Sequence, residues 1–422
     1  MKDYYKRYID KKIAEYSQTI GAICVEGPKF CGKTTSCEQY AKSIFRINTV
    51  DTVNKTLLNP GIALVGEKPH LIDEWQKVPD VWNYIKQDLD EDYQFGKYIL
   101  TGSSTPADKS LIQHNGAGRI SKLKMRTMSL FESKESLGII SLFNLFENGE
   151  FSLHPNQKQT LYKTAFQICR GGWPLSVMAN EENSIKITKN YYNSLFEFED
   201  SKNEKFRNKK PSYFKFILKS YARHISTRAS LNSILQDVIQ NEERTLNKET
   251  LYDYLEALKD LYIIEDLDAW CPNIRSKTAI LTTPTRHFVD TSIACQALGI
   301  SPDDLLNDLN SFGFFFEDFA IRDLRIYSDL YGGSVMHYRD HSNLECDAII
   351  RMPKGKWAAI EIKLGGEELV NYGAKKLNLL KNKLATKSDV VAPTFMAIIT
   401  AFGPCYKRED GIYVIPLNCL KD

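Results

Sequence analysis

One run of eight residues has the spacing of a loop that binds phosphate groups. Gly27-Pro28-Lys29-Phe30-Cys31-Gly32-Lys33-Thr34 fits the pattern G-x-x-x-x-G-K-[ST], between an apolar run at 22–25 and a helical pattern at 34–43. Glycines let backbone amides approach an anion, and the start of a helix attracts negative charge. The residues predicted to bind a nucleotide are Gly27, Pro28, Lys29, Phe30, Cys31, Gly32, Lys33, Thr34 and Thr35.

Lys33 and Thr34 have distinct expected tasks in this loop. The ammonium of Lys33 would contact the β- and γ-phosphates, and the hydroxyl of Thr34 would bind Mg²⁺, which prefers hard oxygen ligands. A chance loop between a strand and a helix is the alternative interpretation.

Two acidic residues end a second apolar strand, at 69–72. Asp73 would hold Mg²⁺ through its water shell. Glu74 would orient and deprotonate an attacking water, because phosphoryl transfer depends mainly on positioning and charge stabilisation. The alternative is that the two acids cap the helix that follows.

Hydroxyl groups and arginines are candidates for contacts with the γ-phosphate. Thr101, Ser103 and Ser104 follow the strand at 97–100, and we favour Ser103 as the sensor, although such residues also form turns. Arg119 follows the glycine-rich segment Gly116-Ala117-Gly118 and could neutralise charge in the transition state, within one subunit or across a subunit boundary of a homo-oligomer. The alternative for Arg119 is a structural arginine, and Arg126 is a second candidate.

Two alternating segments near the C-terminus, 343–351 and 357–364, predict a β-hairpin. If 352–356 is the turn, Asp347 faces Glu361, with Cβ atoms about 4.5–5.5 Å apart. Two close carboxylates repel each other unless a cation or proton lies between them, so a divalent metal is a candidate. Glu345 and Lys363 would form the next pair, and an amphipathic hairpin with cross-strand salt bridges is the alternative.

The order of patterns predicts an α/β protein with three parts. Strand candidates at 22–25, 43–50, 70–72 and 98–100 alternate with helical patterns from about 20 to 130, which predicts a parallel sheet covered by helices, with ligands at the carboxyl ends of the strands. Helical patterns follow, and three short helices with a strand candidate at 261–267 could form a winged helix. A change to hairpin-like strands marks the last part. The expected domains are 1–145, 146–285 and 286–422.

Composition limits the classes of partner and the compartment. The chain has 422 residues, with 55 basic and 53 acidic side chains, so its net charge is near zero and gives no global signal for nucleic acid. Nine cysteines and seven histidines show no zinc-like spacing and no disulfide pattern, which fits a reducing cytoplasm. No apolar stretch approaches the length of a membrane span, so we expect no membrane partner.

Several of these motifs together resemble an AAA-type P-loop ATPase family of bacteria and archaea. The segments that carry the likeness are 27–34, 71–74, 100–104, 118–119, 170–174 (Arg-Gly-Gly-Trp-Pro) and 290–291. Such proteins typically have a C-terminal domain of unknown function related to restriction-endonuclease-like PD-(D/E)xK nucleases. The resemblance therefore implies ATP as the nucleotide, a helical and winged-helix middle region, and a nuclease-like α/β C-terminal domain.

The resemblance also assigns roles in the C-terminal part. Asp347 and Glu361 match the acids of the nuclease core, Lys363 its lysine, and Glu317 its upstream helix acid, so a second Mg²⁺ or Mn²⁺ is implied there. The leading hypothesis is a Mg²⁺-dependent ATPase whose C-terminal domain acts on DNA or RNA under ATP control. The alternative is an ATP-dependent switch whose C-terminal domain binds DNA or a protein partner without cleavage.

Overall fold

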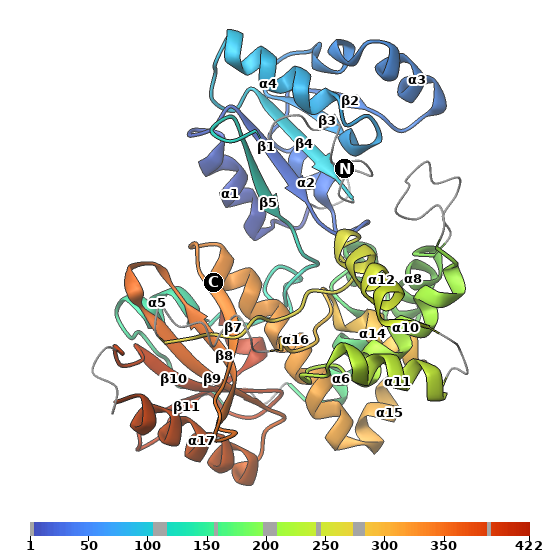
Figure 1. Cartoon of the computed structure of the whole chain (residues 1–422). Coiled ribbons are helices and arrows are strands. Elements are labelled where there is room, and N and C mark those ends of the chain that lie inside the picture. Colours follow the sequence, from blue (N-terminus) through green and yellow to red (C-terminus); the bar gives the residue numbers. More distant parts are fainter. Residues whose placement is uncertain are drawn as a thin grey trace. The chain divides into compact units, whose positions relative to one another are not determined.

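The computed structural model describes residues 4–103, 116–155, 159–196, 209–241, 246–272, 283–385 and 390–422. Its contacts divide the chain into two compact units (Figure 1). The first unit is made of Met1–Thr127, Glu197–Pro211 and Tyr254–Ile263. The second is made of Met128–Phe196, Ser212–Asp253 and Ile264–Asp422.

The first unit is built on a parallel five-stranded sheet with strand order β2-β3-β4-β1-β5. Its strands are β1 (Ala22–Glu26), β2 (Ser43–Arg46), β3 (His70–Asp73), β4 (Tyr98–Gly102) and β5 (Ile120–Lys124). Four of these strands lie where the alternating pattern predicted them, and the parallel α/β arrangement is confirmed. Its helices are α1 (Tyr8–Tyr16), α2 (Lys33–Glu38), α3 (Val50–Leu58) and α4 (Val81–Glu91), with short 3-10 turns at Pro60–Leu64 and Trp75–Lys77.

Two boundaries in this unit differ from the sequence prediction. The helix after the loop ends at Glu38, not at residue 43, because the chain turns at Gln39 and enters β2. The second strand ends at Arg46 because Thr49 caps α3, its hydroxyl accepting a hydrogen bond from the amide of Thr52. A core containing Ile72, Trp75, Trp82, Ile85 and Leu100 packs α4 against the sheet.

The middle of the chain is helical, as the sequence predicted. Its helices are α5 (Leu142–Glu147), α6 (Leu161–Arg170), α7 (Pro174–Met178), α8 (Glu181–Ser194), α10 (Pro211–Arg223), α11 (Leu231–Asn241) and α12 (Lys248–Asp260). After α12, the predicted strand at 261–267 forms only isolated antiparallel bridges, Ile264 with Phe288 and Leu267 with Thr285. A winged helix therefore stays a prediction.

The second unit contains a mixed six-stranded sheet of order β11-β12-β10-β9-β8-β7. These strands are β7 (Ser334–Arg339), β8 (Glu345–Arg351), β9 (Trp357–Lys363), β10 (Phe395–Thr400), β11 (Tyr406–Lys407) and β12 (Tyr413–Pro416). Two short strands pair separately, β6 (Ile140–Ser141) with β13 (Leu420–Lys421). The helices here are α14 (Thr291–Leu298), α15 (Pro302–Asn307), α16 (Leu309–Asp329) and α17 (Glu367–Ala385).

The helices α16 and α17 both contact this sheet. The buried side chains of α17, such as Val370 and Leu377, join a core with Ile349, Ala359 and Ile398 of the strands. In the part of the chain that the structure describes, no helix has the length and apolar character needed to cross a membrane.

A buried charged cluster explains the segments 170–174 and 290–291. Asp290 is fully buried, and its carboxylate accepts hydrogen bonds from the amide of Gly172 (2.9 Å) and from Arg322 (3.2 Å). A Cβ at Gly171 (φ +75°) would lie 2.4 Å from Asp290 Oδ1. Arg322 also forms an ion pair with buried Asp323 (2.7 Å). These residues therefore join α6, α14 and α16, which is a structural role.

Replacing Arg322 by Leu should destabilise the second unit by about 3–5 kcal/mol, because the buried carboxylates of Asp290 and Asp323 would lose the cation that they share. Thermal or denaturant unfolding of the full chain measures this change. Lys186→Met is the control, since Lys186 pairs with Glu182 on the surface and should change stability by at most about 1 kcal/mol. A loss no larger than that of the control would contradict a central role for Arg322.

Candidate nucleotide site and candidate C-terminal site

The carboxylate of Asp73 joins three segments at one edge of the parallel sheet. Its Oδ1 accepts hydrogen bonds from the hydroxyls of Thr34 (2.8 Å) and Thr101 (2.5 Å). Asp73 ends β3, Thr101 lies in β4, and Thr34 lies in α2 directly after the loop. Since parallel strands have their carboxyl ends at the same edge, the loop and both strand ends meet there.

The phosphate-binding loop surrounds the ammonium of Lys33. Lys33 is buried, and its Nζ donates hydrogen bonds to the carbonyl oxygens of Gly27 (2.9 Å) and Pro28 (2.7 Å). Gly32 precedes α2 with φ +102°, which favours glycine. A Cβ at Gly27 would lie 2.0 Å from the carbonyl oxygen of Met125, so only glycine fits this position.

The other predicted loop residues differ in exposure. Cys31 is buried, and its carbonyl oxygen accepts a hydrogen bond from Arg7 (2.8 Å), which ties the loop to the N-terminal helix. Phe30 is 55% exposed, with the ammonium of Lys29 5.4 Å from its ring centroid. Thr35 is exposed in α2.

Glu74 lies beside the predicted sensor Ser103. Its backbone is in the left-handed region (φ 61°), which turns the chain sharply after β3. The carboxylate accepts hydrogen bonds from Ser103 Oγ (3.1 Å) and from Gln76 Nε2 (2.5 Å). The hydrogen bond from Gln76 to Glu74 was not predicted from the sequence, because it depends on this local turn. Ser104 lies outside the described residues.

The structure does not bring Arg119 to the loop. The carbonyl oxygen of Arg119 accepts a hydrogen bond from the amide of Ala22, the first residue of β1. The phosphate-binding loop instead follows Glu26, the last residue of β1. Five residues at about 3.3 Å each put roughly 16 Å between the two ends of that strand. The Arg119 side chain forms an ion pair with Asp90 (2.7 Å). Arg126 lies at the loop end instead, where its carbonyl oxygen accepts a hydrogen bond from Arg7 (2.9 Å).

These residues fit a nucleotide with Mg²⁺. The Thr34 hydroxyl and the Asp73 carboxylate are hard oxygen ligands already in contact, and a buried lysine lies in the adjacent loop.

The predicted hairpin is present in the second unit with the expected turn. Arg351 of β8 pairs with Trp357 of β9, and the amide of Met352 donates to the carbonyl oxygen of Lys356 (2.8 Å). Asp347 Oδ2 accepts a hydrogen bond from the amide of Ile362 (2.8 Å), so it lies beside the end of β9.

Two lysines lie between the carboxylates of this hairpin. Lys363 Nζ is 2.7 Å from Asp347 and 2.8 Å from Glu361, which is fully buried. Lys376 of α17 is 3.1 Å from Glu361 and 3.8 Å from Asp347. Lys363 therefore pairs with both acids of the predicted metal site, whereas the alternative expected it to pair with Glu345. Lys376 was missed because no local signal connects it to a hairpin that precedes it in the chain.

The charged groups of this cluster change one another's pKa values. Burial, with Asp347 nearby, raises the pKa of Glu361 to about 7. Burial acts to raise the pKa of Asp347 too, but Lys363 and Lys376 outweigh it and lower that pKa. Burial would lower the pKa of Lys363, yet the two carboxylates raise it.

The described residues show no second metal site at the C-terminal acids. Within the described residues, no group of three or more His, Cys, Asp or Glu side chains is placed to hold one. Lys363 and Lys376 supply the positive charge that two close carboxylates require. Glu317 of α16 is half-buried and forms no hydrogen bond or ion pair within the described chain, and its pKa is raised well above the usual range by burial and by Asp347.

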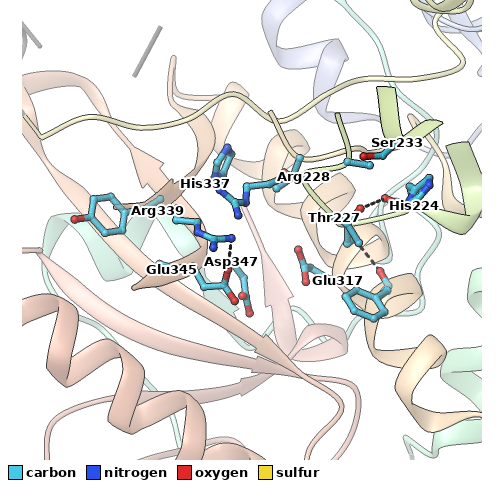
Figure 2. Close-up of a pocket in the computed structure, with 15 residues that line it drawn as sticks. His224, Thr227, Arg228, Ser233, Glu317, His337, Arg339, Glu345 and Asp347 are labelled. Atoms are coloured by element: carbon cyan, nitrogen blue, oxygen red, sulfur yellow. Dashed lines mark hydrogen bonds and ion pairs between the residues drawn. The ribbon is translucent and has the colours of Figure 1, made fainter. Parts of the chain in front are cut away.

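A cavity of about 500 Å³ lies in the second unit beside these acids (Figure 2). One wall is the connection between α10 and α11, which includes Arg228. The opposite wall comes from α16, β7 and β8 and includes Glu317, His337 and Asp347. Segments about 100 residues apart in the chain therefore form one pocket.

Comparison with protein families identifies three segments. Residues 20–134 match "AAA domain", residues 162–304 match "Domain of unknown function (DUF8612)", and residues 312–420 match "Domain of unknown function (DUF4143)". Together with the sheet and the loop geometry, the first match defines the class: the first unit contains a P-loop ATPase domain of the AAA type.

Individual relatives are distant. The chain is 23% identical over 349 residues to the uncharacterized protein Rv2008c of Mycobacterium tuberculosis, and equally to Mb2031c of Mycobacterium bovis, covering 81% of this chain and 70% of each relative. Among solved structures, the Walker-type ATPase PABY2304 of Pyrococcus abyssi is similar at 12% identity with a TM-score of 0.41, covering 70% of this chain and 96% of that chain.

Replacing Gly27 by Ala should weaken ATP binding by at least about tenfold, a loss of about 1.4 kcal/mol. The added methyl group would force Met125 and the loop apart. Calorimetric titration with ATP measures the loss. Gly118→Ala is the control, since that position also has positive φ (+75°) but no atom of the described residues within 4 Å of the added carbon. Equal ATP affinity in wild type and Gly27→Ala would contradict the loop assignment.

Proposed function

We propose that the first unit binds and hydrolyses ATP with Mg²⁺. The observation that carries the proposal is the contact of Thr34 and Asp73 next to the buried ammonium of Lys33. Lys33 would exchange its bonds to loop carbonyls for bonds to phosphate oxygens. The bound Mg²⁺ would neutralise charge on the phosphates, held by the Thr34 hydroxyl and by Asp73.

Glu74 is the proposed base that orients the attacking water. Ser103 and Gln76 hold its carboxylate beside Asp73 through hydrogen bonds of 3.1 and 2.5 Å. A carboxylate so fixed would accept a proton from water in one defined direction. Ser103 would release Glu74 when it contacts the γ-phosphate. A role for Arg119 would require a second subunit, because its own loop lies at the other end of β1.

Lys33→Ala should abolish ATP binding, whereas Glu74→Gln should keep binding and lower kcat by about 10²–10⁴-fold, the usual contribution of a general base. Steady-state ATP hydrolysis and ATP titration on the full chain separate the two effects. Lys42→Ala is the control, because that exposed lysine pairs with Glu67 at 3.5 Å on the surface. Hydrolysis by Glu74→Gln at the wild-type rate would exclude Glu74 as the base.

For the second unit we propose a binding role without cleavage. The supporting observation is the pair of lysines that neutralise Asp347 and Glu361, where the resemblance implied a metal. Metal-dependent cleavage of DNA or RNA, the other candidate function, predicts activity with Mg²⁺ or Mn²⁺ that Glu361→Gln abolishes. A cleavage assay with and without ATP decides between them, and Glu361-dependent cutting would overturn the binding role.

The lysine pairing also predicts an energetic coupling. Glu361→Gln and Lys376→Met should each destabilise the second unit, and the double variant should lose less than the sum by about 1–3 kcal/mol. Glu361→Gln combined with Lys383→Met is the matched control, since Lys383 lies on the same helix but pairs with Asp340 (2.6 Å). Unfolding in denaturant measures these four variants and Lys383→Met alone, which completes the control cycle. Additive losses in both cycles would contradict the pairing of Glu361 with Lys376.

A further inference from the structure

We propose that the pocket in the second unit binds a segment of single-stranded nucleic acid, with one backbone phosphate on Arg228. This inference rests on the proposed binding role of that unit and names its ligand. Figure 2 shows Arg228 extending across the pocket toward His337 and Arg339. The pocket volume of about 500 Å³ lies within the usual range for small-molecule and nucleotide sites, and suits one nucleotide of a strand better than a duplex.

Arg228 is the positive charge that remains available in this pocket. It is half-buried, and it makes no hydrogen bond or ion pair with any part of the chain that the structure describes. By contrast, Arg223 before it pairs with Asp237 at 2.6 Å, and Arg286 pairs with Asp266 at 2.9 Å. A half-buried guanidinium without a partner is a suitable site for a phosphate, which it can bind with two parallel hydrogen bonds.

The acids on the opposite wall do not cancel this charge. Asp347 is paired with Lys363 at 2.7 Å, and Glu345 lies 3.7 Å from Arg339. Glu317, the remaining acid of that wall, has its pKa raised well above the usual range by burial and by Asp347, which favours its uncharged form. The charge of Arg228 therefore stays available for a phosphate.

Two further groups in the pocket have unused hydrogen-bonding capacity. His337 is only 3% exposed, yet its Nε2 has no hydrogen-bond partner among the described residues. Burial lowers the pKa of His337 to about 4, so the ring is neutral near pH 7 and offers one donor or acceptor. The carboxyl group of Glu317 is also without a partner in the described structure. Buried polar groups usually have partners, so the unpaired Nε2 of buried His337 indicates a ligand, and the half-buried carboxyl group of Glu317 is available to the same ligand.

A nucleotide within a strand has the chemistry that these groups require. Its phosphate is an anion for Arg228, while base amino groups and sugar hydroxyls can donate to Glu317 and His337. Inorganic phosphate would satisfy Arg228 alone and leave the other two groups unpaired. The proposal needs no metal, in accordance with the lysine pairing of Asp347 and Glu361.

The test measures binding of a labelled twelve-nucleotide single strand to the full chain in EDTA, by fluorescence anisotropy at several salt concentrations. Arg228→Met should weaken binding by about tenfold or more and reduce the salt dependence by about one phosphate contact. Glu317→Gln, as a second variant, should weaken binding without changing that salt dependence. Arg351→Met is the matched control, because Arg351 is exposed at the end of β8 and does not line the pocket.

The outcomes separate this inference from the proposals on which it rests. Equal affinity in Arg228→Met and wild type, an equal loss in Arg351→Met, or no binding by the wild type would overturn it, and ATP hydrolysis would be unaffected. A mononucleotide or inorganic phosphate that displaces the strand at equal concentration would also overturn it. Arg228-dependent binding together with cleavage in Mg²⁺ would support this inference while contradicting the role without cleavage.

Discussion

One carboxylate organises the nucleotide site of the first unit. Asp73 accepts hydrogen bonds from Thr34 and Thr101, so a single side chain connects α2, β3 and β4 at the edge where the strands end. Glu74 follows directly in a left-handed turn, which places its own carboxylate against Ser103 and Gln76. Any displacement of β3 would therefore move the proposed metal ligand Asp73 and the proposed base Glu74 together.

Much of this site could be predicted from sequence because its signals are local. The glycines, lysine and threonine of the loop lie within nine residues, and each acid follows an apolar strand directly. Gln76 was missed because its contact depends on the backbone conformation of Glu74. A role for Arg119 within its own subunit is not supported, because Arg119 directly precedes β5, a strand that was not anticipated, and the role across a subunit boundary stays a prediction. The position of Arg119 is set by strand pairing with β1, which no local pattern records.

In the second unit, the chemistry depends more on residues that are distant in the sequence. The hairpin register followed from alternation and turn length, and Arg351 does pair with Trp357. The chemistry of the hairpin, however, depends on Lys376 from α17, and that of the pocket depends on Arg228 from the middle of the chain. Such contacts arise only when helices pack on the completed sheet. The segments 170–174 and 290–291 likewise belong to a buried ionic cluster around Arg322, a role that their sequence did not reveal.

The most direct test of the central claim is the Mg²⁺ dependence of ATP affinity in wild type and Asp73→Asn. Asparagine keeps the size of the side chain and one oxygen for the two hydroxyls, but removes the charge. Calorimetric titration of the full chain with ATP, in EDTA and in Mg²⁺, measures how much the ion raises the ATP affinity. We expect Mg²⁺ to raise the ATP affinity of the wild type by about tenfold or more, a gain of about 1.4 kcal/mol, and to leave the ATP affinity of Asp73→Asn unchanged. An equal gain in both proteins would show that Asp73 does not hold the ion.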